Sequence, residues 1–257
     1  MKKIVMLNWK MQLSVNDSFD LAKKIINDIN LEKVELGICP DFLSIYKISE
    51  IIKNSHAKLG SQNTFWSTKG AYTGEVSPTF LKELGVEFII LGHSERRTNL
   101  KETDEIINKK MKTVLENNLT PILCVGENFE ERQDNKKDLV IINQVRSALK
   151  DIDLKNMKRL IIAYEPIWVI GSGQAIESNE AQETNTIIKQ TMYDILYDNG
   201  IEFNEEEFKN KIQILYGGSV DSGNISDFLK EPNIDGVLVG GAGIKFETLN
   251  SLIKSIK

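Results

Sequence analysis

Short apolar runs alternate with amphipathic helical segments along the whole sequence, and this alternation constrains the fold more than any other feature. Eight of the runs are apolar enough for strands that are buried on both faces, as in a parallel sheet. A segment with helical spacing of apolar residues follows each run. The expected strands are residues 4–7, 34–39, 57–62, 88–92, 121–126, 159–163, 212–216 and 236–239.

The number of strand–helix units indicates how the sheet is organised. Eight units in 257 residues, with no linker and no break in composition, predict a single α/β domain over residues 1–257. They match a (β/α)₈ barrel, in which eight parallel strands form a closed sheet. A doubly wound open sheet is the alternative, but it usually carries glycines after its first strand, where this chain has Asn8-Trp9-Lys10.

Composition excludes several classes of function. The net charge of −5 and the scattered Lys and Arg residues argue against nucleic-acid binding. The sequence has no apolar stretch long enough to span a membrane or to form a secretory signal, so we expect no membrane association. Cys39 and Cys124 lie in apolar strands, which predicts buried reduced thiols and a cytoplasmic protein. There is no Cys/His cluster, and we expect neither a metal nor a cofactor.

Polar residues stand where expected strands end, which is where barrels of this kind build their sites. Asn8 and Lys10 follow the first strand, His93 the fourth and Glu165 the sixth. A helix start after His93 disfavours a cation, so we expect a neutral imidazole that polarises a carbonyl. Lys10 would stabilise an oxyanion, and Glu165 would take a proton from carbon. A backbone-bonded histidine and solvent-facing charges are the structural alternatives.

Glycine-rich turns follow the last three strands. Residues 217–219 and 240–241 predict a phosphate site, because glycine lets backbone N–H groups approach an anion closely. Residues 166–173 combine bulky apolar side chains with a Gly-Ser-Gly end, which is typical of a loop that closes over a site; a static loop anchored by Trp168 is the alternative. These features together favour proton abstraction next to the carbonyl of a small phosphorylated substrate.

Seven motifs, in order and at compatible spacings, resemble those of the triosephosphate isomerase family from residue 3 to about residue 254. They are Asn8-Trp9-Lys10-Met11, Gly70-Ala71-Tyr72-Thr73-Gly74-Glu75, Leu91-Gly92-His93-Ser94-Glu95-Arg96-Arg97, Ala163-Tyr164-Glu165-Pro166-Ile167-Trp168, Ile170-Gly171-Ser172-Gly173, Tyr216-Gly217-Gly218-Ser219 and Val239-Gly240-Gly241-Ala242.

The resemblance implies metal-free interconversion of dihydroxyacetone phosphate and D-glyceraldehyde 3-phosphate through an enediolate, a step of glycolysis and gluconeogenesis. Glu165 matches the family's base and His93 its electrophile. Lys10 matches the cation beside the substrate, and Asn8 matches a neighbouring donor. The positions that match the family's phosphate-binding backbone amides are Gly171, Ser219, Gly240 and Gly241.

The resemblance also implies a homodimer, in which the long loop around Thr73 reaches the partner's site. The sequence departs from the family pattern at Gln12, where asparagine is usual, and at Ile176, which is bulkier than the usual alanine at the far end of the lid.

Two alternatives remain from the residues alone: another barrel enzyme that acts on a sugar phosphate, such as an aldolase or epimerase, and a non-catalytic barrel that binds one. A Schiff-base aldolase would need a lysine within a strand core, and these cores have none. A non-catalytic barrel would be expected to lack Lys10, His93 or Glu165, and all three are present.

Overall fold

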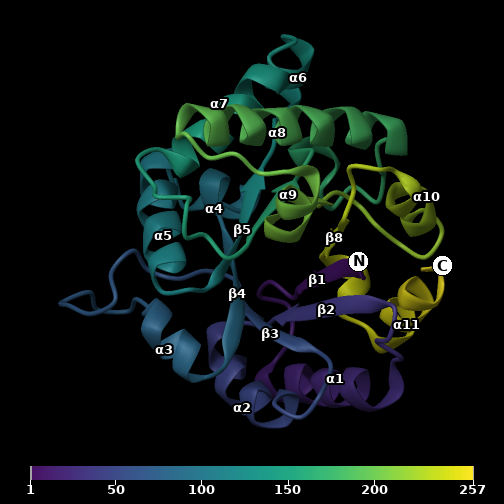
Figure 1. Cartoon of the computed structure of the whole chain (residues 1–257). Coiled ribbons are helices and arrows are strands. Elements are labelled where there is room, and N and C mark those ends of the chain that lie inside the picture. The colour runs from purple at the N-terminus through teal and green to yellow at the C-terminus, as the bar shows by residue number, and fades with distance from the viewer. Residues whose placement is uncertain (1, 257) are drawn as a thin grey trace.

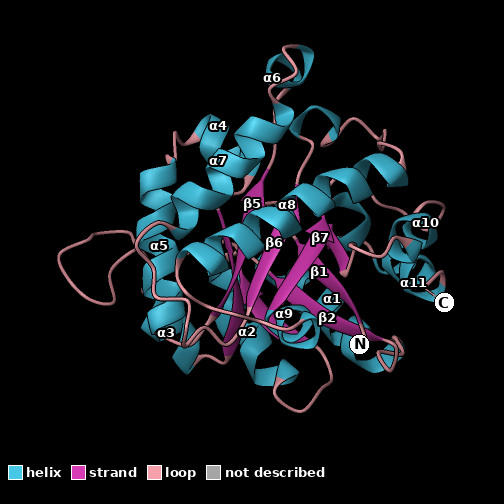
Figure 2. Cartoon of the chain, turned by 45° about the horizontal axis from the view of Figure 1, so that its top comes forward, coloured by secondary structure: helices cyan, strands magenta, loops and turns pink. Residues whose placement is uncertain are grey.

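The computed structural model describes residues 2–256, which form a closed barrel of parallel strands surrounded by helices (Figures 1 and 2). Each strand pairs with the next one in the chain, and β8 pairs with β1 to close the sheet. The predicted barrel is therefore confirmed, and the open sheet is excluded. The strands are Lys3–Asn8 (β1), Val34–Cys39 (β2), Lys58–Ser61 (β3), Val86–Leu91 (β4), Thr120–Val125 (β5), Leu160–Tyr164 (β6), Ile212–Tyr216 (β7) and Gly236–Val239 (β8).

Helices connect the strands, and side-chain caps fix where many of them begin. Ser14, for example, accepts the N–H of Asp17 at the start of α1. In residues 2–256, no helix combines the length and the apolar character needed to cross a membrane. The helices are Val15–Asp28 (α1), Phe42–Ile52 (α2), Pro78–Glu83 (α3), Ser94–Asn99 (α4), Asp104–Glu116 (α5), Phe129–Gln133 (α6), Lys137–Leu149 (α7), Ser178–Asp198 (α8), Glu205–Lys211 (α9), Ile225–Lys230 (α10) and Phe246–Lys254 (α11), with 3₁₀ turns at Ile167–Val169 (η1) and Gly241–Gly243 (η2).

Local contacts decide the boundaries of three helical regions. The segment 127–150 forms two helices, α6 and α7, because Asn135 between them takes a left-handed φ of +56°. The helix α5 begins at Asp104, since Thr103 caps it by accepting the N–H of Ile106. The sequence does not predict α9, because that short helix buries Phe208 and is otherwise charged or polar.

Alternate residues of each strand point into the barrel and sort its interior into layers. At the amino ends of the strands, Arg159 donates to both carboxylate oxygens of Glu35 (2.6 and 2.8 Å) and to Gln213 (2.7 Å). At the opposite ends, the same two-residue period brings Asn8 and Glu165 inward. The apolar layers between these polar ends are Ile4, Met6, Cys39, Phe88, Ile90, Ile122, Cys124, Ile161, Ala163, Leu215 and Leu238.

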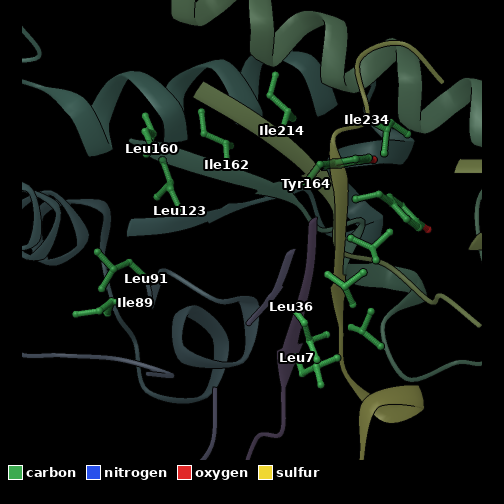
Figure 3. Close-up of a cluster of buried hydrophobic side chains, with 14 of the residues drawn as sticks. Leu7, Leu36, Ile89, Leu91, Leu123, Leu160, Ile162, Tyr164, Ile214 and Ile234 are labelled. Atoms are coloured by element: carbon green, nitrogen blue, oxygen red, sulfur yellow. The ribbon is translucent and has the colours of Figure 1, made fainter. Parts of the chain in front are cut away.

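The outward residues of the same strands form a second, larger core with the surrounding helices. Figure 3 shows part of this core, with Leu7, Leu91 and Ile162 among side chains from several strands. Burial of both faces explains why the strands are continuous apolar runs. Cys39 and Cys124 are buried and free, as the sequence predicts.

The seam between β1 and β8 makes Gly236 a sensitive position. Gly236 pairs with Ile4, and a Cβ at this position would lie 2.1 Å from the Ile4 carbonyl oxygen. We expect Gly236→Ala to lower the free energy of unfolding by about 1–3 kcal/mol, measured by urea denaturation, because the strands must separate.

Gly223→Ala is the control, because its Cβ would meet only the end of the Asp221 side chain, at 3.2 Å. It should change the free energy of unfolding by less than about 0.5 kcal/mol. Equal stabilities of the two variants would show that strand contact at the seam is not tight.

Candidate active site

One cavity at the carboxyl ends of the strands contains all eight site residues predicted from the sequence. Its volume is about 360 Å³, which suits a small ligand. The loops after β1, β4, β6, β7 and β8 all contribute to its wall. The predicted residues that line it are Asn8, Lys10, His93, Glu165, Gly171, Ser219, Gly240 and Gly241.

The carboxylate of Glu165 is held between an imidazole and a backbone amide, and the residue is only 2% exposed. Its Oε1 lies 3.1 Å from Nε2 of His93, and its Oε2 accepts the N–H of Ser94 at 3.0 Å. Nδ1 of His93 accepts the N–H of Glu95 at 3.2 Å, at the start of α4. Because Nδ1 is an acceptor, a neutral His93 carries its proton on Nε2, the nitrogen that faces the carboxylate.

The neighbouring strand β5 shapes the surroundings of Glu165. The N–H of Glu165 donates to the carbonyl of Val125 at 2.7 Å. A Cβ on Gly126 would lie 1.7 Å from the Glu165 carbonyl oxygen, so only glycine permits this approach. Burial is the main cause that raises the pKa of the Cys124 thiol well above its ordinary value, and the nearby Glu165 carboxylate is the second. Cys124 therefore stays uncharged beside Glu165.

Lys10 places a positive charge in the cavity. Its Nζ forms an ion pair with Glu95 at 2.6 Å, and its N–H donates to Oδ1 of Asn8 at 3.1 Å. A Cβ on Gly240 would lie 3.4 Å from Cε of Lys10, so the lysine lies against the glycine turn that follows β8. The positive charge and the glycine turn are thus neighbours in the cavity.

The segment 166–176 is anchored at both ends and exposed in between. Trp168 donates its indole N–H to the Glu127 carboxylate at 3.0 Å, and Ser219 donates its hydroxyl to the Val169 carbonyl at 3.2 Å. Val169 and Ile176 are buried, whereas residues 171–175 are exposed. Residues of this exposed tip line the cavity, so a movement of the tip would open or cover it.

Sequence analysis missed Glu127, which the structure places under the loop as its anchor. The carboxylate is fully buried and accepts the Tyr164 hydroxyl at 3.2 Å as well as the Trp168 N–H. The Arg132 guanidinium lies 3.6 Å from the carboxylate and 4.5 Å from the centre of the Trp168 ring. Burial raises the pKa of Glu127. One sequence signal exists, because Glu127 closely follows β5 and thus stands at a strand end like the other site residues.

Known proteins with similar sequences share one description. A family model described as "Triosephosphate isomerase" matches residues 3–256. The chain is 42% identical to the triosephosphate isomerase of Dictyoglomus thermophilum over 255 residues, which cover 99% of each chain. It is 41% identical to that of Endomicrobium trichonymphae over 257 residues, with 100% of this chain and 99% of the relative covered. The protein of that description from Clostridium botulinum is 39% identical over 250 residues, which cover 97% of this chain and 98% of the relative.

The raised pKa of Glu127 predicts a pH dependence of stability. The folded protein holds a proton on Glu127 more tightly than the unfolded chain does. Stability should therefore fall as pH rises from the ordinary glutamate range through the raised pKa. Glu127→Gln removes this titration, so the wild type should lose stability relative to the variant by at most about 1.4 kcal/mol per pH unit in that window.

Urea denaturation of both proteins between about pH 4.5 and 8 would measure this difference. Glu130→Gln, at an exposed residue of α6, is the control and should give a nearly constant difference from the wild type. A wild type that gains stability relative to Glu127→Gln as pH rises would contradict the assignment.

Proposed function

The chain belongs to the triosephosphate isomerase family, and from this premise we propose that its Glu165, His93, Lys10 and Asn8 perform the family's reaction. That reaction is the interconversion of dihydroxyacetone phosphate and D-glyceraldehyde 3-phosphate, a step of glycolysis. The residue assignment rests on the contact of the buried Glu165 carboxylate with the His93 imidazole, in the cavity that Lys10 also lines. Family membership does not favour another barrel activity or a non-catalytic sugar-phosphate barrel.

The proposed chemistry is a proton transfer between adjacent carbons. Glu165 takes a proton from the carbon next to the carbonyl and returns it to the neighbouring carbon. For this step its carboxylate must exchange the contacts with Ser94 and His93 for the substrate. Nε2–H of His93 donates to the carbonyl oxygen and moves protons between the two oxygens of the enediolate. Lys10 and Asn8 stabilise the negative charge on these oxygens.

The glycine turns account for binding of the phosphate group. We assign the phosphate contacts to Gly171, Ser219, Gly240 and Gly241, which line the cavity from three loops. Gly171 is part of the exposed loop tip, so a phosphate bound to all three loops would draw that tip over the substrate. A closed loop would exclude water from the enediolate.

Apolar side chains on consecutive strand ends support the proposed homodimer. Met11 (95% exposed) follows β1, Leu43 (80%) lies just after β2, and Leu100 (62%) follows the short helix after β4. The loop after β3, which contains Tyr72 and Thr73, projects from the body of the barrel (Figure 1). In a closed barrel these ends occupy one side of the rim, and an apolar surface of this kind suits a subunit interface.

Two broader assignments complete the proposal. Residues 1–257 would act as one catalytic domain, since the first and last strands pair with each other. A cytoplasmic location is supported by two buried cysteines that are not joined in a disulfide. The reaction would need neither metal nor cofactor, because the proposed residues supply the base, the proton donor and the cation.

A direct assay tests the reaction and the base together. Purified protein should convert glyceraldehyde 3-phosphate into dihydroxyacetone phosphate at the same rate with and without a chelator. Glu165→Gln should fold normally and lose activity on the order of 10²–10⁴-fold, because it keeps the shape and removes the base. Glu247→Gln, at an exposed residue of α11, is the matched control and should keep full activity. Undiminished turnover by Glu165→Gln would refute the base.

Sedimentation tests the dimer. Thr73→Arg should shift the protein toward monomer, because it places a charge in the packed contact made by the projecting loop. Thr186→Arg adds the same charge on the exposed face of α8 and should leave the dimer intact. An undisturbed dimer in Thr73→Arg would count against this loop as the interface.

A further inference from the structure

Lys10 has an unusual backbone for a residue with a functional side chain. Its φ is +53°, in the left-handed region that side chains other than glycine rarely adopt. Such a conformation persists only where surrounding contacts determine it. On one side, Trp9 is buried and donates its indole N–H to the carbonyl of Gly243 at 3.0 Å. On the other side, Met11 is exposed in the single chain, so within its own barrel the segment after Lys10 has no comparable anchor.

Gln62 supplies the missing anchor. It directly follows β3 and is half-buried beside the carboxyl ends of β1 and β2. Its amide nitrogen donates to the carbonyl of Lys10 at 2.8 Å and to the carbonyl of Cys39 at 3.0 Å. In residues 2–256, no other side chain is bonded to the Lys10 carbonyl. One side-chain amide therefore joins the strained turn after β1 to the end of β2.

The opposite end of the lysine is fixed by a different contact. Its ammonium group is paired with Glu95 at 2.6 Å, on the first turn of α4. This pair is partly exposed, and an exposed ion pair by itself restrains a long side chain only weakly. The hydrogen bond from Gln62 acts on the Lys10 backbone itself, and it therefore restrains the position of the lysine more directly than the ion pair at the end of the side chain.

We propose that Gln62 is a positioning residue, which holds the left-handed backbone of Lys10 so that the ammonium group stays at the reacting oxygens. This inference rests on the role of Lys10 in the proposed function. Without the two amide donors, the turn can relax toward an ordinary φ, and the Cα and Cβ atoms of Lys10 then move away from the cavity. Small displacements of a charged group from its working position cause large losses of rate.

A double-mutant cycle separates positioning from plain structural support. Gln62→Met keeps the length of the side chain and removes both donors, and we expect kcat/KM for glyceraldehyde 3-phosphate to fall about tenfold or more. In the Lys10→Met variant, kcat/KM should fall further. In a protein that already carries Lys10→Met, adding Gln62→Met should change kcat/KM by less than about twofold, because the residue through which Gln62 acts is gone.

Asn108 offers a matched control far from the cavity. Its amide nitrogen also donates to two carbonyls, those of Ala148 at 3.0 Å and Lys150 at 2.9 Å. Asn108→Leu should lower the unfolding temperature to a similar extent as Gln62→Met and leave kcat/KM unchanged. Should Gln62→Met fail to fold, Gln62→Asn keeps the amide but shortens its reach, and it should show the same loss and the same dependence on Lys10.

Each outcome separates this inference from the proposed function. Unchanged kcat/KM in a folded Gln62→Met protein, with a large loss in Lys10→Met, would overturn the role of Gln62 alone. Losses from the two substitutions that multiply in the double variant would also overturn it, because Gln62 would then act independently of Lys10. Full activity in Lys10→Met would instead refute the role of Lys10 in the proposed function.

Discussion

Pairing of β8 with β1 closes the parallel sheet, and this closure sets which side chains fill the barrel and where the cavity lies. A closed sheet has no free edge, and its inward side chains must fill a column of fixed width. The two-residue period of each strand then decides which residues enter that column. In this chain it places apolar side chains in the middle of the column and polar ones at both ends. Because all strands are parallel, their carboxyl ends meet at one rim, where Asn8 and Glu165 become neighbours in one cavity.

Buried and half-buried charges in this barrel are stabilised by specific hydrogen-bond partners. Arg159 and Glu35 form a two-fold hydrogen-bonded pair at the amino ends of the strands. The Glu165 carboxylate has the Ser94 amide and the His93 imidazole. Burial of Glu127 is unfavourable for its charged form, since it raises the pKa despite two hydrogen-bond donors and a nearby arginine. The buried carboxylate in return holds one end of the loop over the cavity through Trp168. A loop that is fixed only at its ends keeps a tip that is free to move.

Strain and support are also divided between different elements at the rim. Lys10 takes a left-handed backbone in a turn after β1, while the side chain that bonds its carbonyl comes from the end of β3 and its ionic partner comes from α4. Three separate units of the barrel therefore set the place of one charge. Such convergence favours a preorganised site, because the energy of the unusual conformation is offset during folding and not when a substrate binds.

The barrel could be predicted from the sequence, because strands buried on both faces are continuous apolar runs. Their ends mark the rim and so identified Asn8, Lys10, His93 and Glu165, whereas the four phosphate-site positions came from the resemblance to a family. The sequence did not determine the division of α6 from α7, the start of α5 or the presence of α9, which depend on Asn135, on the Thr103 cap and on a helix that buries little beyond Phe208. The contacts of Glu127 with the loop and of Gln62 with the Lys10 carbonyl became visible only in the folded chain. Both contacts join segments far apart in the chain, and no local sequence pattern around either residue predicts its partner.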